Sequence, residues 1–336
     1  MARLRFEELK RFLERSAVAA HAPDRVTMRE RYRGVLVGVA AGNALGLGVE
    51  GWSRRLIEAR FPNGVREADA AERERPWDDD LAQTAILGEA LLAGEELTPE
   101  DLASRLLRWA YDNGRGMGNL SWRVLSELAS GTPPAVASRR VWERDGRAPA
   151  GNGAVMRCAP VALRWRTSGH RLVEETATSA LVTHYDPRCV WSAVALNVAL
   201  ALSLGGATPD LEELATALDR AGAPVEVGAA IRFVRGRALP ELLLDHRADM
   251  GYTLKAMQVG LWSLQQELDF EEVLVRVVNA GGDTDTNGAV AGAVMGSRVG
   301  VSGIPSRWVA NIREAGHLLD LADRLFEACE GAGATG

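Results

Sequence analysis

Apolar side chains recur along most of this chain at three- and four-residue spacing, which is typical of one face of a helix, and no set of alternating strands stands out. Several segments begin with residues that favour a helix start. Thr98-Pro99-Glu100-Asp101 offers an N-cap hydroxyl, an early proline and two acids, and Thr208-Pro209-Asp210 repeats the device. Asp269 precedes Glu272 with capping-box spacing, and we expect that helix to end at Gly281-Gly282. The pattern predicts an all-α fold.

Two stretches, 62–77 and 131–153, break the helical pattern with charged residues, glycine and proline, and both are predicted to be loops. Apolar helices flank each of them, so neither is expected to link independent domains. We expect residues 1–30 to form a helical extension and residues 31–330 to form the main domain. The extension is expected to dock on the protein's own core, with a partner-binding arm as the alternative, through an apolar face made of Leu4, Phe6, Leu9, Phe12 and Leu13.

Composition and charge indicate how the helices pack and which kind of partner is not expected. Apolar residues make up 47% of the 336 residues and aromatic residues only 6%, with alanine, leucine and glycine dominant. This composition favours helices that pack closely through small side chains. The formal net charge is −6, and the arginines are scattered among acids, so a nucleic-acid partner is not expected.

The cysteines, the N-terminus and the apolar runs indicate in which cellular compartment the protein is expected to reside. The three cysteines are widely spaced and belong to no Cys-x-x-Cys motif, so neither a disulfide framework nor a zinc site is expected. A cytoplasmic monomer fits best, because the N-terminus carries early acids and does not resemble a signal peptide. The glycine-rich apolar runs 34–49 and 288–301 are too short to span a bilayer, so no membrane association is expected.

Two groups of acids carry the candidate chemistry. Asp78-Asp79-Asp80 precedes one helix-like run, and Asp283-Thr284-Asp285-Thr286 precedes another about 200 residues later. One explanation is helix capping, since acids at helix starts satisfy free N–H groups and suit the dipole. Capping needs one acid, however, and not three in a row. Carboxylates beside a hydroxyl are the ligands that Mg²⁺, Ca²⁺ or Mn²⁺ prefer, so the two groups together predict a site for hard cations.

The residues after Asp285 are unusually small. Glycine in a helix costs about 1 kcal/mol relative to alanine, so a helix that keeps three glycines needs a reason. Close approach to a neighbouring helix supplies one, and we expect it to help bring the two acidic groups together. The small residues are Gly288, Ala289, Ala291, Gly292, Ala293 and Gly296.

Five segments, taken in order over about residues 32–325, make the chain resemble the ADP-ribosylglycohydrolase family, which includes the dinitrogenase reductase-activating glycohydrolases. The last of the five is the most specific, and an ordered set of this kind does not arise readily by chance. The segments are Gly38–Glu50, Trp77–Asp80, Gly151–Arg157, Thr183–Pro187 and Gly281–Thr286.

The resemblance implies a compact orthogonal helical bundle with two Mg²⁺ ions in a cleft, where the metals hold the ribose of ADP-ribose beside the bond to be cut. The metal ligands it implies are Asp78, Asp79, Asp80, Asp283, Asp285 and Thr286. Its catalytic residues map to Glu50, Asp79 and Asp285, with Glu50 on a loop over the cleft. Its substrate-binding residues map to Asn119, Gly151, Asn152, Gly153 and His184.

Three departures from the family pattern stand out. Asp78 replaces the usual Thr or Ser, and Leu81 replaces the threonine that usually closes that motif. Asn43 stands where the family usually has an aspartate, and Gly116 stands where many relatives have another. In the nitrogenase-associated enzymes that second aspartate is catalytic, so their regulatory role is not carried over to this chain.

The sequence therefore predicts an Mg²⁺-dependent hydrolase that cleaves the glycosidic bond between ADP-ribose and an acceptor. Two alternatives stay open: another metal-dependent N-glycosidic or phosphate hydrolase on the same scaffold, and a non-catalytic ADP-ribose-binding protein. The sequence does not identify the acceptor, which leaves arginine, serine, a nucleic-acid base, O-acetyl-ADP-ribose and a small guanidine in play.

Overall fold

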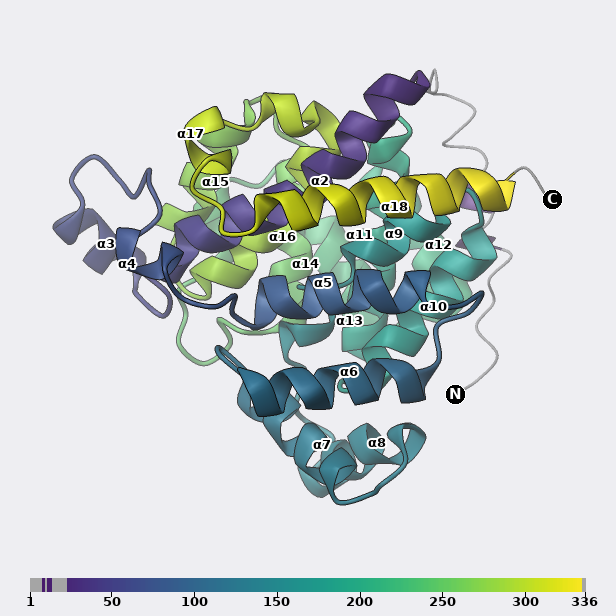
Figure 1. Cartoon of the computed structure of the whole chain (residues 1–336). Coiled ribbons are helices and arrows are strands. Elements are labelled where there is room, and N and C mark those ends of the chain that lie inside the picture. The colour runs from purple at the N-terminus through teal and green to yellow at the C-terminus, as the bar shows by residue number, and fades with distance from the viewer. Residues whose placement is uncertain (1–7, 10, 14–22, 334–336) are drawn as a thin grey trace.

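The computed structural model describes residues 8–9, 11–13 and 23–333, and within these residues it contains helices and two isolated β-bridges but no longer strand (Figure 1). The all-α prediction is confirmed. Three short 3₁₀ helices are η1 (Asn152–Ala154), η2 (Leu239–Leu242) and η3 (Val301–Gly303). The α-helices are α2 (Arg25–Leu47), α3 (Arg54–Arg60), α4 (Ala70–Arg73), α5 (Asp79–Leu92), α6 (Pro99–Asp112), α7 (Asn119–Ala129), α8 (Pro134–Arg144), α9 (Ala159–Trp165), α10 (Gly169–Leu181), α11 (Pro187–Leu204), α12 (Leu211–Ala221), α13 (Val225–Val234), α14 (Thr253–Leu264), α15 (Phe270–Asn279), α16 (Thr284–Val299), α17 (Ser306–Val309) and α18 (Ala315–Gly333).

Helices α2 and α16, far apart in sequence, run antiparallel with their backbones in direct contact. A Cβ atom added to Gly38 would lie 2.1 Å from the carbonyl oxygen of Gly292, and one added to Gly292 would lie 1.9 Å from that of Gly38. No side chain fits at such distances. The same contact recurs once per helical turn, through the facing pairs Gly34–Gly296, Gly38–Gly292, Gly42–Gly288 and Gly46–Thr284.

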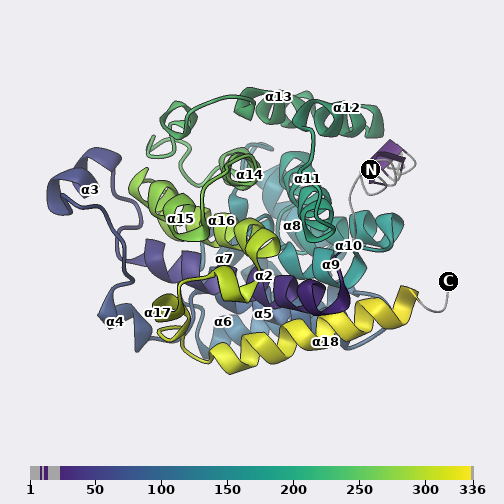
Figure 2. The same cartoon turned by 90° about the horizontal axis from the view of Figure 1, so that it is seen from above.

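This contact confirms that the small residues of α16 serve close packing, but their partner is α2 and not the helix that carries the other acids. The antiparallel arrangement sets the C-terminal end of α2 beside the N-terminal end of α16. In the view from above (Figure 2) the helices lie in successive layers, with α18 outermost, then α2, then α16, then α14 with α11, and finally α12 with α13.

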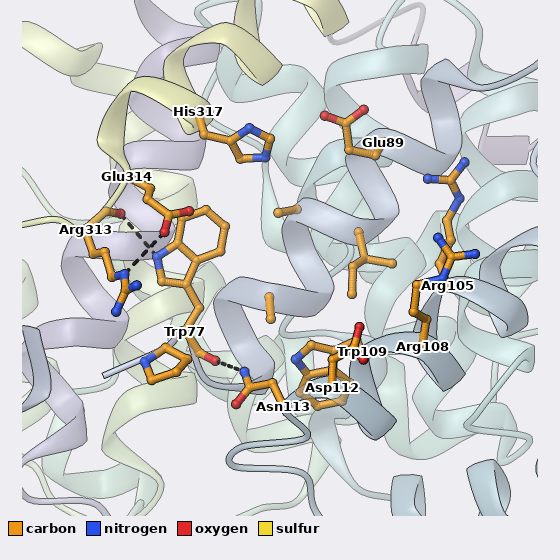
Figure 3. Close-up of a pocket in the computed structure, with 14 residues that line it drawn as sticks. Trp77, Glu89, Arg105, Arg108, Trp109, Asp112, Asn113, Arg313, Glu314 and His317 are labelled. Atoms are coloured by element: carbon orange, nitrogen blue, oxygen red, sulfur yellow. Dashed lines mark hydrogen bonds and ion pairs between the residues drawn. The ribbon is translucent and has the colours of Figure 1, made fainter. Parts of the chain in front are cut away.

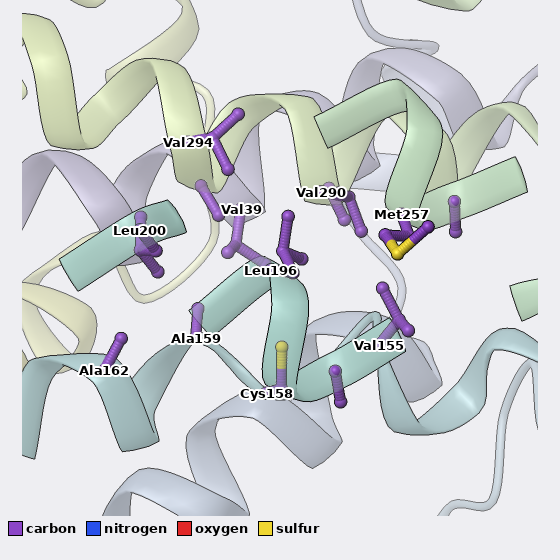
Figure 4. Packing of buried hydrophobic residues seen from close by; sticks show 14 of the residues in the cluster. Val39, Val155, Cys158, Ala159, Ala162, Leu196, Leu200, Met257, Val290 and Val294 are labelled. Atoms are coloured by element: carbon purple, nitrogen blue, oxygen red, sulfur yellow. The ribbon is translucent and has the colours of Figure 1, made fainter. Parts of the chain in front are cut away.

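The hydrophobic core fills the space between these layers. Val39 of α2, Val294 of α16, Leu196 of α11 and Met257 of α14 are all buried, and Figure 4 shows them converging near α9. The three cysteines, which include Cys158 in this region, are buried free thiols.

Helix α11 is long and apolar enough to cross a membrane, yet 89% of its apolar window is buried inside the protein. A core helix of a folded protein is buried in the same way, so the length and apolar composition of α11 are weak evidence for a membrane span. The sequence pattern had singled out the glycine-rich runs 34–49 and 288–301 instead. Those runs correspond to α2 and α16, which are buried as expected.

Two of the three predicted helix starts are confirmed. Thr98 accepts a hydrogen bond from the Asp101 N–H at the start of α6, and Asp269 accepts one from the Glu272 N–H at the start of α15. The third start lies later than predicted. Asp210, and not Thr208, caps α12, and it accepts hydrogen bonds from the first turn.

The loop predicted at 131–153 is wrong in part, because it contains α8, and the loop predicted at 62–77 contains the single-turn α4. Helix α8 buries Ala137 and Val141, which lie four residues apart on one face, while Arg139 and Glu143 pair on the outside. Proline favours the first helical position as well as loops, so Pro134 does not distinguish the two.

The N-terminal extension is described only in part. Leu9 and Phe12 of the predicted apolar face are buried in the core, while Leu4 and Phe6 lie outside the described residues. Helix α2 crosses residue 30, where we placed the boundary between extension and main domain. That division stays a prediction.

The α2–α16 contact gives a first testable expectation. We expect Gly38→Ala or Gly292→Ala to lower the free energy of unfolding by about 3 kcal/mol, because the added methyl group forces two backbones apart. Gly316→Ala is the matched control, since a Cβ at that helical position meets nothing within 4 Å. Urea denaturation followed by tryptophan fluorescence measures both, and an equal effect at the two sites would contradict the backbone contact.

Candidate metal centre and catalytic cleft

Both acidic groups stand at helix N-termini, but neither caps its helix through the side chain of its N-cap residue. Asp78 is the N-cap residue of α5 and Asp283 that of α16, and neither side chain makes a capping hydrogen bond. The exposed fractions of Asp78, Asp80 and Asp285 are 1%, 1% and 5%. Capping alone does not explain several carboxylates that are this deeply buried side by side.

The fold brings the two groups together around Asp285. Carboxylate oxygens of Asp78, Asp80 and Asp285 lie within 4.8 Å of one another, and so do those of Glu50, Asp283 and Asp285. Asp285 therefore belongs to both sets, which adjoin. The hydroxyl of Thr286 also reaches this point and donates to Asp80 Oδ2 at 3.2 Å.

The oxygens of this cluster suit a cation. Oδ1 of Asp78, of Asp80 and of Asp285 is buried without a hydrogen-bond partner among the described residues. Burial, together with the neighbouring carboxylates, raises the pKa of Asp79 to about 7 and the pKa values of Asp80 and Asp285 well above the ordinary range. Buried like charges need a counter-charge to ionise together, and hard divalent cations prefer such an all-oxygen set. The residues present fit the metal that the sequence predicted.

A cleft of about 260 Å³ opens over the cluster. Asp78 is the one predicted site residue that does not line it, and it lines a separate small cavity together with Asn43. The cleft is lined by the remaining predicted residues, Glu50, Asp79, Asp80, Asn119, Gly151, Asn152, Gly153, His184, Asp283, Asp285 and Thr286, and by Gly116, Gly118, Leu120, Ser121, Met156 and Gly251.

Glu50 reaches the cluster from the turn after α2, and backbone hydrogen bonds hold that turn in place. The Gly51 N–H donates to the Gly282 carbonyl, and the Gly282 N–H donates to the Trp52 carbonyl, both at 2.8 Å. A Cβ on Gly281 would lie 2.7 Å from the carbonyl oxygen of Trp52, so a glycine is needed for this close approach. Glu50 itself is exposed at the cleft.

The Gly151–Asn152–Gly153 loop forms another part of the cleft lining. Asn152 Nδ2 donates to Asp283 Oδ2 at 2.6 Å, and the Asn152 N–H donates to the carbonyl of Gly251 at 3.1 Å. Gly251 was missed by sequence reasoning, because the segment around it carries no motif and only its glycine marks a turn. The loop is thus fixed to the metal cluster on one side and to the start of α14 on the other.

Volume alone does not select this cleft as the site. A larger cavity of about 450 Å³ lies between α5, α6 and the start of α18, around Trp77 and Trp109 (Figure 3). Its charges are of both signs and lie near the surface, and Glu89 and Glu314 are paired with Arg324 and Arg313. Among the described residues that line this larger cavity, no carboxylate is buried without a partner, whereas Asp80 and Asp285 are in the smaller cleft.

Comparisons with known proteins agree with this geometry. A model of the ADP-ribosylglycohydrolase family matches residues 24–335. The chain belongs to this family. An ADP-ribosylglycohydrolase-related protein complex of known structure superimposes with a TM-score of 0.71 and 29% identity, covering 90% of this chain and 99% of that one.

Curated relatives of this glycohydrolase family span most of the chain. An uncharacterised protein of Archaeoglobus fulgidus is 32% identical, over 89% of this chain and 97% of its own. ADP-ribosylarginine hydrolase Tri1 of Pseudomonas putida is 27% identical, over 89% of this chain and 78% of its own. ADP-ribosyl-[dinitrogen reductase] glycohydrolase of Rhodospirillum rubrum is 29% identical, over 85% of this chain and 91% of its own.

The structure links two of the departures from the family pattern. Asn43 Nδ2 donates to Asp78 Oδ2 at 2.9 Å, and both side chains are buried. In the family pattern these two positions usually hold an aspartate and a residue with a hydroxyl group. That pair also contains one hydrogen-bond donor and one acceptor. In this chain position 78 carries the carboxylate, and the amide at position 43 supplies the donor. The carboxylate gained at position 78 is thus matched by the one lost at position 43.

The third departure, Gly116, is also consistent with the space available beside Asp79. Gly116 has a positive φ of 79°, and a Cβ there would lie 2.4 Å from Asp79 Oδ1. An aspartate at position 116 would displace Asp79, so the observed position of Asp79 requires a glycine at position 116.

The Asn43–Asp78 pair gives a second expectation. Asn43→Asp would set two buried carboxylates at hydrogen-bond distance, and we expect it to lower the free energy of unfolding by about 3 kcal/mol. Asp78→Thr in the same chain restores a donor and should recover most of that loss. Urea unfolding in EDTA of wild type, both single variants and the double variant measures the coupling. A double variant no more stable than Asn43→Asp would contradict the pairing.

Proposed function

We propose that this chain is a magnesium-dependent ADP-ribosyl hydrolase that cleaves the glycosidic bond between ADP-ribose and an acceptor. Family membership supports the reaction class, since two of the relatives named above bear the names ADP-ribosylarginine hydrolase and ADP-ribosyl-[dinitrogen reductase] glycohydrolase. In the proposed reaction the bond from the anomeric carbon to the acceptor breaks and a bond to a water oxygen forms. The products are ADP-ribose and the free acceptor.

The observation that carries the proposal is the sharing of Asp285 by two adjoining oxygen groups. One group includes Asp78 and Asp80, and the other includes Glu50 and Asp283. This arrangement suits two neighbouring Mg²⁺ ions, with Asp79 and Thr286 as further ligands; Mn²⁺ and Ca²⁺ take similar oxygen donors. When bound, the ions supply positive charge that offsets the carboxylates and orients the ribose hydroxyls.

The roles of the protein's own residues follow from their places in the cleft. Glu50 is the most exposed carboxylate of its group, and we assign it to the attacking water and not to an ion, so that it can take a proton from that water. Asp79 and Asp285 stabilise the positive charge that develops on the ribose, because such reactions pass through an oxocarbenium-like state. The Gly151–Gly153 loop and Asn119 line the other side, where N–H groups suit the oxygens of the diphosphate.

The acceptor is the open part of the proposal. Two of the similar proteins are named ADP-ribosylarginine hydrolases, so ADP-ribosylarginine is the first substrate to try. Serine-, nucleobase- and acetyl-linked ADP-ribose complete a panel in which release of ADP-ribose is measured. A protein that binds ADP-ribose but releases none from any member would be a binder and not a hydrolase.

The metal assignment is tested by Asp285→Ala. We expect hydrolysis to fall by at least about a hundredfold, and the stabilisation by Mg²⁺ in a thermal shift assay to disappear. In EDTA the variant should be no less stable than wild type, because one buried like charge is gone. Asp320→Ala removes an exposed acid on α18 and serves as the control. Retained Mg²⁺ stabilisation in Asp285→Ala would overturn the assignment.

The role of Glu50 is tested by Glu50→Gln. We expect kcat to fall about a hundredfold or more while the Kd for ADP-ribose changes little, because the amide keeps the shape but cannot take a proton. Glu58→Gln, an exposed acid of the neighbouring α3, is the matched control. Full turnover by Glu50→Gln, measured as ADP-ribose release, would show that another group acts as the base.

A further inference from the structure

Behind the Gly151–Gly153 loop, the guanidinium of Arg157 is completely buried. It donates to Gln83 Oε1 of α5 at 2.7 Å and to the carbonyl of Ser179 in α10 at 3.0 Å. It also donates to Thr183 Oγ1 at 2.7 Å. An arginine side chain has donors and no acceptor, so the direction of each of these hydrogen bonds is fixed.

Thr183 passes this constraint on to His184. Thr183 Oγ1 lies 2.7 Å from His184 Nδ1, and Arg157 and this ring nitrogen are its partners in the described part of the chain. The hydroxyl oxygen receives the arginine proton, and its own proton then has one acceptor in reach, which is Nδ1. A proton on Nδ1 would leave the buried hydroxyl proton with no acceptor, an arrangement that folded proteins avoid. The imidazole proton therefore belongs on Nε2.

The same surroundings keep the ring neutral. His184 is 2% exposed, and the positive guanidinium of Arg157 lies one residue away along the hydrogen-bond chain. Burial, with Arg157 adding to it, lowers the pKa of His184 to about 3. An imidazolium would also place protons on both ring nitrogens, which meets the same conflict at Thr183.

Nε2 is on the cleft side of the ring. His184 lines the cleft, and Cβ atoms built on Gly151 and Gly153 would lie 3.6 Å and 3.0 Å from Nε2. The two glycines thus leave room for the imidazole edge between them. Nε2 has no hydrogen-bond partner in the described residues, and it does not belong to the unpartnered atoms sealed from solvent.

We propose that Arg157 and Thr183 are positioning residues that hold His184 as a neutral Nε2–H tautomer, so that it donates a hydrogen bond to an oxygen of the ADP-ribose unit. The inference rests on the proposed function for the identity of that ligand. In this role His184 is a fixed donor on the wall facing the acids, and it does not act as a general base.

The tautomer is tested without any activity assay, from the ring ¹⁵N NMR signals of the full-length protein labelled in histidine. His184→Gln assigns the signals among the five histidines. We expect a protonated Nε2 and an unprotonated Nδ1, unchanged between about pH 5 and about pH 8, where an ordinary histidine titrates. Addition of ADP-ribose should then shift the Nε2–H signal. A protonated Nδ1, or titration in this range, would overturn the proposal.

Thr183→Val removes the hydroxyl at nearly constant shape. We expect it to change the Nδ1 signal and to raise the Kd for ADP-ribose about tenfold, with the effect on KM larger than that on kcat. Thr183→Ser keeps the hydroxyl and should stay within about twofold of wild type. Thr183→Val with wild-type ring signals and affinity would overturn the positioning role, and the wild-type spectrum decides the tautomer even where that variant does not fold. Absence of ADP-ribose binding by wild type would instead count against the proposed function.

Discussion

The backbone contact between α2 and α16 is the constraint on which the site depends. Four successive turns of each helix meet through backbone atoms, and at three of these contacts both residues are glycine. Side chains can change rotamer, but two backbones in contact have little freedom to slide or separate. The antiparallel register delivers the turn that carries Glu50 to the segment that carries Asp283. Glu50 and half of the acidic cluster are thus positioned by helix geometry and not by flexible contacts.

The close packing that positions the acids also has an electrostatic cost. The same packing that fixes the cluster buries its carboxylates and raises their pKa values, which makes the metal-free cluster costly to ionise. The Asn43–Asp78 pair shows how little freedom this leaves. A carboxylate gained at one buried position is matched by one lost at the neighbouring position. A second buried carboxylate at position 43 would lie at hydrogen-bond distance from Asp78, so the neutral amide keeps the local charge tolerable.

Much of this was accessible from the sequence, for identifiable reasons. The two acidic groups were found because three consecutive carboxylates, and the Asp-Thr-Asp-Thr segment, are incompatible with ordinary capping. The all-α fold followed from helical periodicity, which is the most reliable of sequence signals. The small residues of α16 were rightly associated with close packing, but one helix does not name its partner. The matching glycines of α2 were visible, spaced by four, without being connected to those of α16.

Other features depend on long-range contacts that leave no local trace. Gly251 braces the Asn152 loop through its carbonyl oxygen, and any residue has such an oxygen. Helix α8 was taken for a loop because Pro134 is compatible with either structure. The fixed tautomer of His184 required knowing that a buried arginine lies behind Thr183.

The hydrogen bonds between the Glu50 turn and the glycine pair before Asp283 have a consequence for the working cycle. A motion that withdraws Glu50 from the cleft must break the bond from Gly51 to Gly282 and the bond from Gly282 to Trp52, and so must disturb the residue beside Asp283. Linkage makes this coupling reciprocal: a cation bound at Asp283 opposes opening of the turn, and an open turn weakens the hold on that cation. An opening of this turn would therefore be thermodynamically coupled to cation binding at Asp283, and each would change the free energy of the other.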